Sequence, residues 1–399
     1  MSSPSVAIAH DQFRTLGGAE RVCIELARTF DAPIFTMRVD EGILPDDVEV
    51  HCLAGKWGDR LMHRGPHAQD LYQMLAWQHA EPLYDYDVVI QNKTNPWWFV
   101  PKTEQTVVRY CHSPPRQPYD QFWRFGGGVV GNGMKTAIRT LFRQTLPYAD
   151  GWLCYSDVVA RRTERYLGVD EGDIDVVYPP VTTTQYSRAD AETGDYYVSV
   201  SRLSRNKRLP QIVDAFRGTD RQLIIAGDGE RREELEEATA DCPNVQLRGY
   251  VDEAEKADLL AGARAFVMNA EQEDFGMTPI EAFAAGTPVV GVREGMTKYQ
   301  VMDGVNGVTY SRGAAMLRAA LDRFEREGVE WDEQTIEEFA DLFSVERFRV
   351  RVEECVRRAQ AEAAITPAFE RNRDRGEHAQ PRAPTPERAE VRADGGDAE

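Results

Sequence analysis

The sequence predicts an α/β protein made of two doubly wound domains. The chain has 399 residues, which is too long for one typical hydrophobic core and suits two domains of roughly 150 to 200 residues. Short apolar runs rich in β-branched residues alternate with helical patterns along most of this length. These runs are continuous rather than alternating in polarity, as expected for parallel strands buried on both faces.

The predicted strands fall into two series, separated by a stretch rich in Pro, Thr and Asp at 178–195. Such a composition is typical of a connection between domains. We therefore expect an N-terminal domain over 1–185 and a C-terminal domain over 186–343. The first series is predicted at 6–10, 32–39, 48–53, 86–92, 106–113, 151–156 and 175–181, and the second at 196–203, 222–229, 245–251, 263–270 and 287–292.

The end of the chain divides into a helical part and a charged part. Residues 314–364 carry apolar side chains at helical spacing, and we expect 344–365 to form a helix that packs back toward the N-terminal domain. Residues 366–399 are charged, rich in Pro, Gly and Ala, and nearly free of large apolar side chains. Such a segment buries too little surface to fold, so it is predicted to be a disordered acidic tail.

The charge balance is strongly acidic. Asp and Glu outnumber Lys and Arg by 66 to 47, and only seven of the 47 cations are lysine. This pattern favours a hydrated surface adapted to high salt, with an ordinary acidic surface as the alternative. A net charge of −19 argues against nucleic acid as a partner, because binding a phosphate backbone needs an excess of cations.

The cysteines and the apolar runs indicate where the protein works. The six cysteines show no CxxC motif and no pairing with histidine, so they are interpreted as small buried side chains in a reducing compartment. No apolar run approaches the roughly 18 residues that a membrane span needs, and the start lacks the pattern of a secretory signal. We expect a cytoplasmic protein, with peripheral contact at the cytoplasmic face of a membrane as an open alternative.

Candidate binding residues follow the predicted strands, because ligands of open α/β sheets bind beyond the carboxyl ends of the strands. The first junction has His10 at the end of a strand and Gly17-Gly18 just before a helix. Glycines let the backbone approach a ligand closely, and the free N–H groups and dipole of a helix start suit an anion. The alternative is a simple Gly-Gly turn.

The second junction is HSPPRQPYD, in which a strand delivers His112 into a loop held by three prolines, with Arg116 and Asp120 nearby. Prolines fix the backbone and so hold side chains in place, as a site requires. The alternative is a structural turn with a hydrogen-bonded histidine.

The third junction, SRLSRNKR, places Arg202 at a strand end and Lys207 just ahead of the next helix. A guanidinium fork and a point-charge ammonium together suit a diphosphate. A solvated basic loop is the alternative.

The fourth junction carries two carboxylates, Glu273 and Glu281, in EDFGMTPIEAFAAG. The spacing of Thr278, Pro279 and Glu281 predicts a capping box, with Thr278 at N-cap and Glu281 at N3. This interpretation gives Glu281 a structural duty and leaves Glu273, at the end of its strand, facing the crevice. The sequence has no Asp pair at a strand end and no His/Cys cluster, so it does not suggest a metal site.

Five motifs occur along the chain in the order GGAER, SRLSRNKR, LIIAGDGE, VQLRGYV and EDFGMTPIEAFAAGTPVVG. With them the chain resembles the family-4 (group 1) retaining glycosyltransferases over about 5–360. The resemblance implies the GT-B fold, with two Rossmann-like domains facing across a cleft, the first on the acceptor side and the second binding the nucleotide sugar. HSPPRQPYD further resembles a mannosyltransferase-like subgroup of surface polysaccharide and glycolipid synthesis. Gln117 and Pro118 depart from that subgroup's aromatic residue after the arginine.

The resemblance implies transfer of a hexose from a nucleoside-diphosphate sugar to a hydroxyl of a glycan or lipid-linked acceptor, with retention and without a tightly bound cofactor or a required metal. Arg202 and Lys207 would hold the diphosphate, and Glu273 the donor hexose. Glu281 would contact the ribose, and His112 the transferred sugar. The implied catalytic residues are His112, Arg202, Lys207 and Glu273; the implied nucleotide-sugar contacts are Gly17, Gly18, Arg202, Lys207, Gly249, Tyr250, Glu273, Phe275, Gly276, Met277 and Glu281.

Three other functions stay open at this point. A nucleotide-sugar epimerase shares the fold, a non-catalytic protein could bind a nucleotide sugar, and a glycosidase would use two carboxylates as Glu273 and Glu281 suggest. On the acceptor side, aromatic rings suit stacking on a sugar or contact with a lipid headgroup, although such a cluster is often local core. The candidates there are His10, Arg116, Asp120, Trp97 and Trp98.

Overall fold

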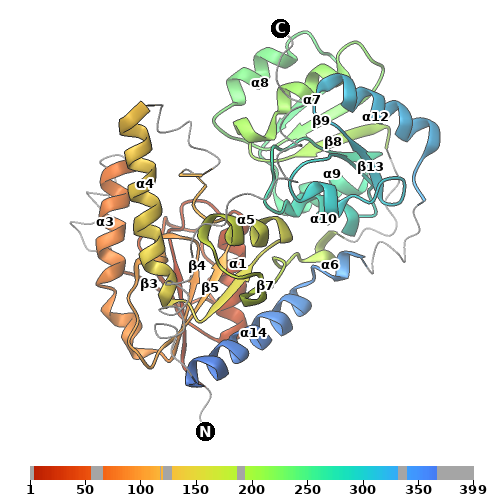
Figure 1. Ribbon diagram of the computed structural model, residues 1–399. Helices are drawn as coiled ribbons and strands as arrows, with labels where there is room; N and C mark the ends of the chain where they lie inside the picture. Colours follow the sequence, from red (N-terminus) through yellow and green to blue (C-terminus); the bar gives the residue numbers. More distant parts are fainter. Residues whose placement is uncertain are drawn as a thin grey trace.

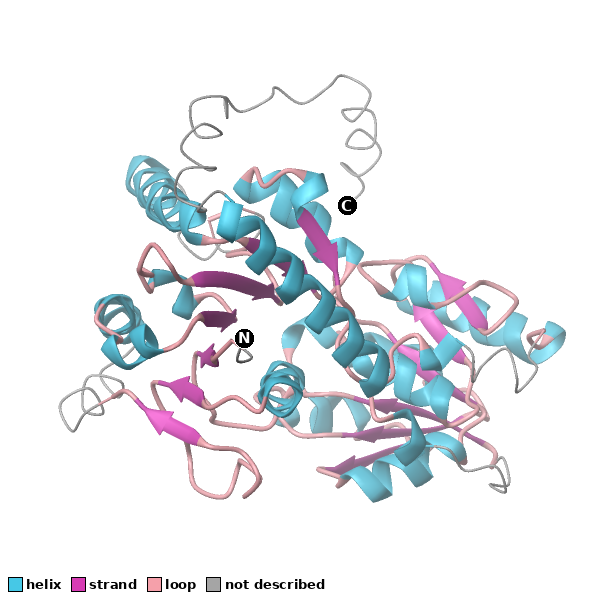
Figure 2. Cartoon of the chain, turned by 90° about the horizontal axis from the view of Figure 1, so that it is seen from below, coloured by secondary structure: helices cyan, strands magenta, loops and turns pink. Residues whose placement is uncertain are grey.

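The computed structural model describes residues 4–54, 66–116, 118–119, 128–186, 194–330 and 339–365. These residues form two α/β domains, each with one fully parallel sheet, which lie beside each other (Figure 1). Helices flank both faces of the strands (Figure 2). The predicted fold class is confirmed. Every strand that the sequence predicts is present, with shorter bounds at most ends.

The N-terminal sheet has the order β3-β2-β1-β4-β5-β6-β7. The order reverses between β1 and β4, and ligands of open α/β sheets bind beyond the carboxyl ends of the strands at such a reversal. The strands are β1 (Val6–His10), β2 (Ile34–Thr36), β3 (Val50–Cys52), β4 (Val88–Asn92), β5 (Thr106–Cys111), β6 (Gly151–Cys154) and β7 (Ile174–Val176). The helices are α1 (Gly18–Phe30), α3 (Pro66–Gln78), α4 (Gly128–Thr145) and α5 (Asp157–Leu167), with 3-10 turns η1 (Glu81–Asp85), η2 (Asn95–Trp98), η4 (Leu146–Tyr148) and η5 (Glu171–Asp173).

The C-terminal sheet has the order β10-β9-β8-β11-β12-β13 and reverses between β8 and β11. Its edge strand β13 was not predicted, because GVTY is a run of four residues that begins with glycine. The strands are β8 (Tyr196–Val200), β9 (Gln222–Ala226), β10 (Val245–Gly249), β11 (Ala265–Met268), β12 (Val289–Val292) and β13 (Gly307–Tyr310). The helices are α6 (Thr183–Tyr186), α7 (Leu209–Phe216), α8 (Arg232–Thr239), α9 (Glu253–Ala261), α10 (Met277–Ala284), α11 (Thr297–Gln300) and α12 (Ala314–Glu327), with the 3-10 turn η6 (Arg205–Lys207).

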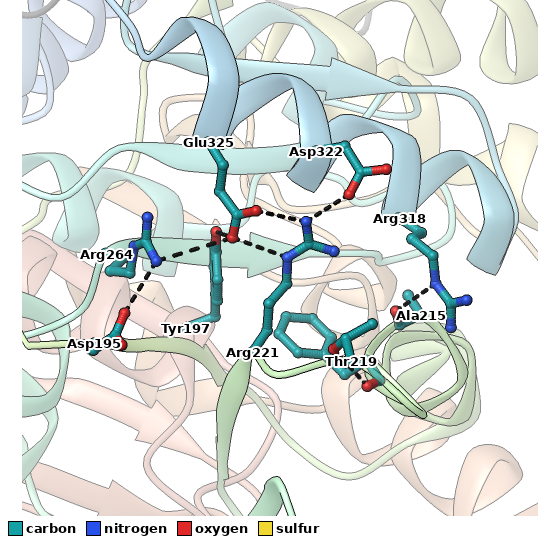
Figure 3. A network of polar contacts seen from close by, with 10 residues as sticks. Asp195, Tyr197, Ala215, Thr219, Arg221, Arg264, Arg318, Asp322 and Glu325 are labelled. Atoms are coloured by element: carbon teal, nitrogen blue, oxygen red, sulfur yellow. Dashed lines mark hydrogen bonds and ion pairs between the residues drawn. The ribbon is translucent and has the colours of Figure 1, made fainter.

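An ion network fixes α12 against the C-terminal sheet (Figure 3). Arg221 donates to Asp322 at 2.5 Å and to Glu325 at 2.6 Å. The hydroxyl of Tyr197 donates to the same Glu325 at 2.8 Å. These contacts lie at the amino ends of β8 and β9. They are therefore remote from the carboxyl ends of the strands, where ligands of such sheets bind.

The last helix, α14 (Val345–Ile365), returns to the N-terminal domain (Figure 1, blue). Phe348, Val352, Cys355, Val356 and Ala359 bury one face of α14 in the same core as β5 and α1. The chain therefore crosses twice between the domains, and the two crossings touch, because the N–H of residue 181 donates to the carbonyl of residue 343 at 2.8 Å. The tail predicted to be disordered, 366–399, lies outside the described residues.

Candidate active site

The Gly17-Gly18 loop of the N-terminal domain faces the C-terminal domain. A Cβ atom built on Gly17 would lie 3.8 Å from a terminal guanidinium nitrogen of Arg202, and one built on Gly18 would lie 3.3 Å from the methyl of Met277. The first N–H groups of α1 have no partners within the helix, so this helix start offers donors to an anion. The structure therefore brings four of the predicted residues together from both domains.

Lys207 and Glu273 are in direct contact. The Lys207 Nζ atom donates to Glu273 Oε2 at 2.5 Å, and each side chain is less than one-fifth exposed. The two loops are also joined through the backbone, because the N–H of Glu271 donates to the carbonyl of Asn206 at 2.7 Å. An ammonium has three donors, so a Lys207 side chain that donates one to Glu273 can offer two to a ligand anion.

The backbone of Glu273 is itself fixed. The N–H of Met296 donates to the Glu273 carbonyl at 2.8 Å. Gly295 has a φ of +54°, and a Cβ there would lie 2.4 Å from the backbone N and O of Glu273. Glycine at 295 therefore allows a second loop to pass directly against the Glu273 backbone.

The predicted capping box is wrong. Helix α10 begins at Met277 with Gly276 as its N-cap, and no side chain caps it. Gly276 has a φ of +80°, a conformation that turns the chain into the helix before Thr278 is reached. Thr278 thus lies inside the first turn, and Glu281 is released from the duty assigned to it.

Glu281 instead has the environment of a ligand contact. It is 3% exposed, and its Oε1 accepts from Lys256 Nζ at 3.0 Å. Its Oε2 is buried and has no hydrogen-bond partner within the described part of the chain. A buried carboxylate oxygen without a partner is costly, and a ligand hydroxyl would satisfy it.

Gly249 and Tyr250, two of the predicted nucleotide-sugar contacts, lie at the carboxyl end of β10. Gly249 closes β10 with a φ of +78°. The side chain of Tyr250, which follows it, is 79% exposed. An exposed aromatic ring directly after a strand end is a suitable surface for a planar base.

On the N-terminal side, a chain of polar contacts joins the ends of three strands. Asn92 lies between two histidines, with its Nδ2 2.9 Å from His10 Nδ1 and its Oδ1 2.5 Å from His112 Nε2. Glu20 continues the chain, with Oε1 3.7 Å from His10 Nε2 and 2.6 Å from Lys93 Nζ. The other oxygen of Glu20 accepts the N–H of Gly17 at 3.1 Å. The chain therefore runs from His112 to the Gly17-Gly18 loop.

Removal from water keeps the fully buried His10 and the half-buried His112 neutral. It lowers the pKa of His10, although the nearby carboxylate of Glu20 opposes the shift. It also lowers the pKa of His112 to about 3, and the positive charge of Lys93 adds to the effect. Burial alone would raise the pKa of Glu20, but its contacts with His10 and Lys93 hold that pKa well below its usual value. At neutral pH the cluster thus contains two neutral imidazoles and one carboxylate.

We expect the protein to lose stability as the pH falls from 6.5 toward 3. Histidines of the unfolded chain bind protons below about pH 6.5, whereas a folded histidine with a pKa of about 3, such as His112, stays neutral. The unfolded state then holds more protons, so the free energy of unfolding falls by about 1.4 kcal/mol per pH unit for each such histidine. Urea unfolding at several pH values measures the slope, and His112→Gln should reduce it. Equal slopes in the two proteins would contradict the assignment.

The loop that carries Glu273 is also held by the N-terminal domain. The next residue, Asp274, pairs with Arg162 and lies 3.6 Å from Arg116. The hydroxyl of Ser156 donates to the Asp274 carbonyl at 2.5 Å. The sequence analysis missed Asp274 and Arg162, because residues 112 positions apart share no local spacing signal. These contacts couple the position of Glu273 to the arrangement of the domains.

Comparison with known proteins identifies the family. A model described as "Glycosyl transferases group 1" matches residues 183–339, and one described as "Glycosyltransferase Family 4" matches residues 16–185. The chain belongs to the group 1 glycosyltransferases. The resemblance that the motifs suggested is therefore confirmed.

Relatives of this glycosyltransferase include mannosyltransferases. The alpha-1,3/1,6-mannosyltransferase ALG2 of Homo sapiens is 23% identical over 372 residues, which cover 81% of this chain and 88% of ALG2. A GDP-mannose-dependent alpha-(1-6)-phosphatidylinositol dimannoside mannosyltransferase of Mycobacterium tuberculosis is 34% identical over 99 residues, covering 23% of this chain and 26% of that protein. The crystal structure of HepE of Anabaena in complex with UDP and glucose matches with a TM-score of 0.66 at 16% identity, over 88% of this chain and 98% of that one. The glycosyltransferase has the GT-B fold.

Two predicted contacts of the glycosyltransferase need correction. The Phe275 side chain is fully buried. It packs against Tyr178 of the N-terminal domain and Phe343 of the second crossing, so it is part of the core between the domains. Trp97 is also fully buried, with the guanidinium of Arg109 4.9 Å from its ring centroid. It therefore belongs to the core and has no face for an acceptor.

The other acceptor-side candidates lie in different surroundings. Trp98 is partly exposed and packs on Phe142 at 5.1 Å between ring centroids. His10 is fully buried, so its side chain has no surface for an acceptor. Asp120 lies outside the described residues. Among the residues that the structure describes, no group of three or more His, Cys, Asp or Glu side chains is arranged to hold a metal ion.

Proposed function

We propose that this glycosyltransferase moves a hexose, with mannose as the first choice, from a nucleoside diphosphate to a hydroxyl acceptor with retention of anomeric configuration. The observation that carries the proposal is the contact between Lys207 and Glu273, in the same domain as Arg202, whose guanidinium lies beside Gly17 at the start of α1. Mannose is chosen because relatives of this chain are named as mannosyltransferases.

The chemistry demands positive charge at the leaving group. In glycosyl transfer the transition state is oxocarbenium-like, and negative charge grows on the departing diphosphate. Interactions that strengthen as this charge develops raise the rate, whereas uniform binding does not. Arg202 and Lys207 supply cations, and the free N–H groups of α1 add donors from the other domain.

The neighbouring groups then fix the rest of the donor. Glu273, held against Lys207 and Met296, accepts hydroxyls of the donor hexose, and the unpartnered Oε2 of Glu281 accepts a ribose hydroxyl. Tyr250 lies beside the base. His112 contacts the transferred sugar from the N-terminal side. Each proposed role pairs a side chain of the described structure with a part of the donor that has matching chemistry.

The acceptor is proposed to be a glycan or a lipid-linked sugar that approaches from the N-terminal domain near Arg116 and Trp98. The human relative is a mannosyltransferase and the mycobacterial one is named for a phosphatidylinositol dimannoside. No helix in the described ranges is both long and apolar enough to cross a membrane. We propose that the reaction takes place in the cytoplasm, with peripheral contact at the membrane when the acceptor is lipid-linked.

A donor and acceptor screen tests the proposal. Purified protein is incubated with GDP-mannose, UDP-glucose, UDP-galactose or UDP-N-acetylglucosamine, alone or with soluble and polyprenyl-phosphate-linked sugars. We expect release of nucleoside diphosphate and a new glycoside that depends on the acceptor, with the donor's anomeric configuration by NMR. A new nucleotide sugar formed without acceptor would instead show an epimerase. Binding without turnover would show a non-catalytic protein, and an inverted product would contradict retention.

A further inference from the structure

Asn92 occupies the point where the order of the N-terminal sheet reverses. It is the last residue of β4, in register with His10 at the end of β1 and with Tyr110 on β5, two residues before His112. It is fully buried. The mechanism proposed above gives Asn92 no role, yet its amide touches both histidines of the cluster.

The orientation of the Asn92 amide follows from a third contact. The atom that faces His10 also lies 3.1 Å from the backbone carbonyl of Ala19 in the first turn of α1. A carbonyl oxygen only accepts hydrogen bonds. The atom facing it must therefore be the amide nitrogen, Nδ2, and the atom facing His112 must be the oxygen, Oδ1. The reversed orientation would set two oxygens against each other.

This orientation fixes the proton on each histidine. Asn92 Oδ1 accepts, so His112 must carry its proton on Nε2, the nitrogen 2.5 Å away. The second hydrogen of Nδ2 points to His10 Nδ1 at 2.9 Å, so that nitrogen must be unprotonated and His10 carries its proton on Nε2, toward Glu20. A neutral imidazole has one donor and one acceptor nitrogen. One amide thus selects one tautomer for both rings.

The selected tautomer leaves His112 with an acceptor toward the sugar. Its ring lies between Tyr110 and Tyr155, with centroids 5.2 Å and 5.1 Å away, so the ring has little freedom to turn. With Nε2 engaged by Asn92, Nδ1 is the nitrogen that remains for a ligand. We propose that Asn92 is a positioning residue that holds His112 as the Nε2–H tautomer, so that Nδ1 accepts a hydrogen bond from a hydroxyl of the transferred sugar. The last step rests on the proposed function.

The tautomers are measured directly in the full-length protein without any donor. Long-range ¹H–¹⁵N correlation spectra at neutral pH distinguish protonated from unprotonated ring nitrogens, and signals are assigned by their loss in His10→Gln and His112→Gln. We expect an Nε2–H signal and an unprotonated Nδ1 for both rings. A protonated Nδ1 on His112, or an imidazolium at pH 7, would overturn the proposal.

Variants of Asn92 separate positioning from stability. In Asn92→Asp the carboxylate still accepts from His112 but cannot donate to His10, so His10 should change to the Nδ1–H tautomer while His112 keeps its own. Asn92→Leu removes both constraints, so the His112 signals should show a mixture of tautomers. The matched control is Gln91→Leu, which removes two buried hydrogen bonds, to Pro96 and Arg109, at the preceding position of β4. It should lower stability without changing either tautomer.

Activity tests which nitrogen meets the sugar. The side-chain oxygen of asparagine lies near the position of histidine Nδ1, whereas that of glutamine reaches toward Nε2. With GDP-mannose as donor, His112→Asn should retain more transfer than His112→Gln, and Asn92→Leu should lower kcat by about 10²-fold, as for other misplaced groups. A more active glutamine variant would overturn the proposal. Correct tautomers with no turnover of any donor would contradict the proposed function instead, and normal turnover with an Nδ1–H His112 would contradict this inference alone.

Discussion

Replacing Lys207 with alanine is expected to lower kcat for sugar transfer by about 10²- to 10³-fold, the usual effect of removing one donor aimed at developing charge. The Nζ atom lies 2.5 Å from Glu273 and is proposed to face the leaving diphosphate. Because that charge grows mainly in the transition state, KM for the donor should change less than kcat. Initial rates of nucleoside diphosphate release at several donor concentrations give both constants.

Arg205→Ala is the matched control for this substitution. Arg205 lies in the same short turn, η6, and its loss changes the loop by the same charge. We expect a change of less than about twofold in kcat, because surface charges away from the reacting atoms contribute little. Equal losses in the two variants would mean that Lys207 acts through general attraction of the donor, and the proposed role would be wrong.

Replacing Gly295 with alanine is expected to disable the site without replacing any residue proposed to bind the donor. The added Cβ would lie 2.4 Å from the Glu273 backbone, far inside van der Waals contact, so the loop of Glu273 must move. A displacement of about 1 Å in a positioned group costs on the order of 10²-fold in rate. We expect a loss of this size in kcat, measured with the donor that the screen identifies.

Gly304→Ala separates the clash from the backbone effect. Gly304 also has a positive φ, +81°, but a Cβ there meets no atom within 4 Å. A residue other than glycine in this conformation costs about 1–2 kcal/mol, so both variants should unfold at lower urea concentration. Only Gly295→Ala should lose transfer activity. If Gly304→Ala loses as much, the activity depends on global stability rather than on Glu273.

The strands were predictable because burial on both faces of a parallel sheet gives a continuous apolar run. β13 was not predicted because its short run begins with glycine. The start of α10 was misplaced because the N-cap is Gly276, two residues before the predicted Thr278. A conformation with positive φ leaves no periodic pattern in a sequence. Local signals thus predicted which elements exist better than where each one begins.

The site was predictable where its residues follow strands directly. Arg202, Lys207 and Glu273 were predicted because ligands of such sheets bind at the strand ends, and the contact between Lys207 and Glu273 agrees with that argument; their roles toward a donor stay predictions. Asn92 also ends a strand, but nothing in YDVVIQN indicates that two histidines lie on either side of it. Trp97 was a candidate for acceptor contact but is buried, because the sequence alone does not say which side of a turn faces the core.

The return of α14 to the N-terminal domain also sets an order of assembly during synthesis. Domains generally fold as units while the chain emerges, the first one first. Here the N-terminal core needs Phe348 and Val352 of α14, so it stays incomplete until the whole C-terminal domain has been made. We expect ribosome-bound chains that stop at 330 to leave an apolar groove open along α1 and β5, a surface that a chaperone would bind.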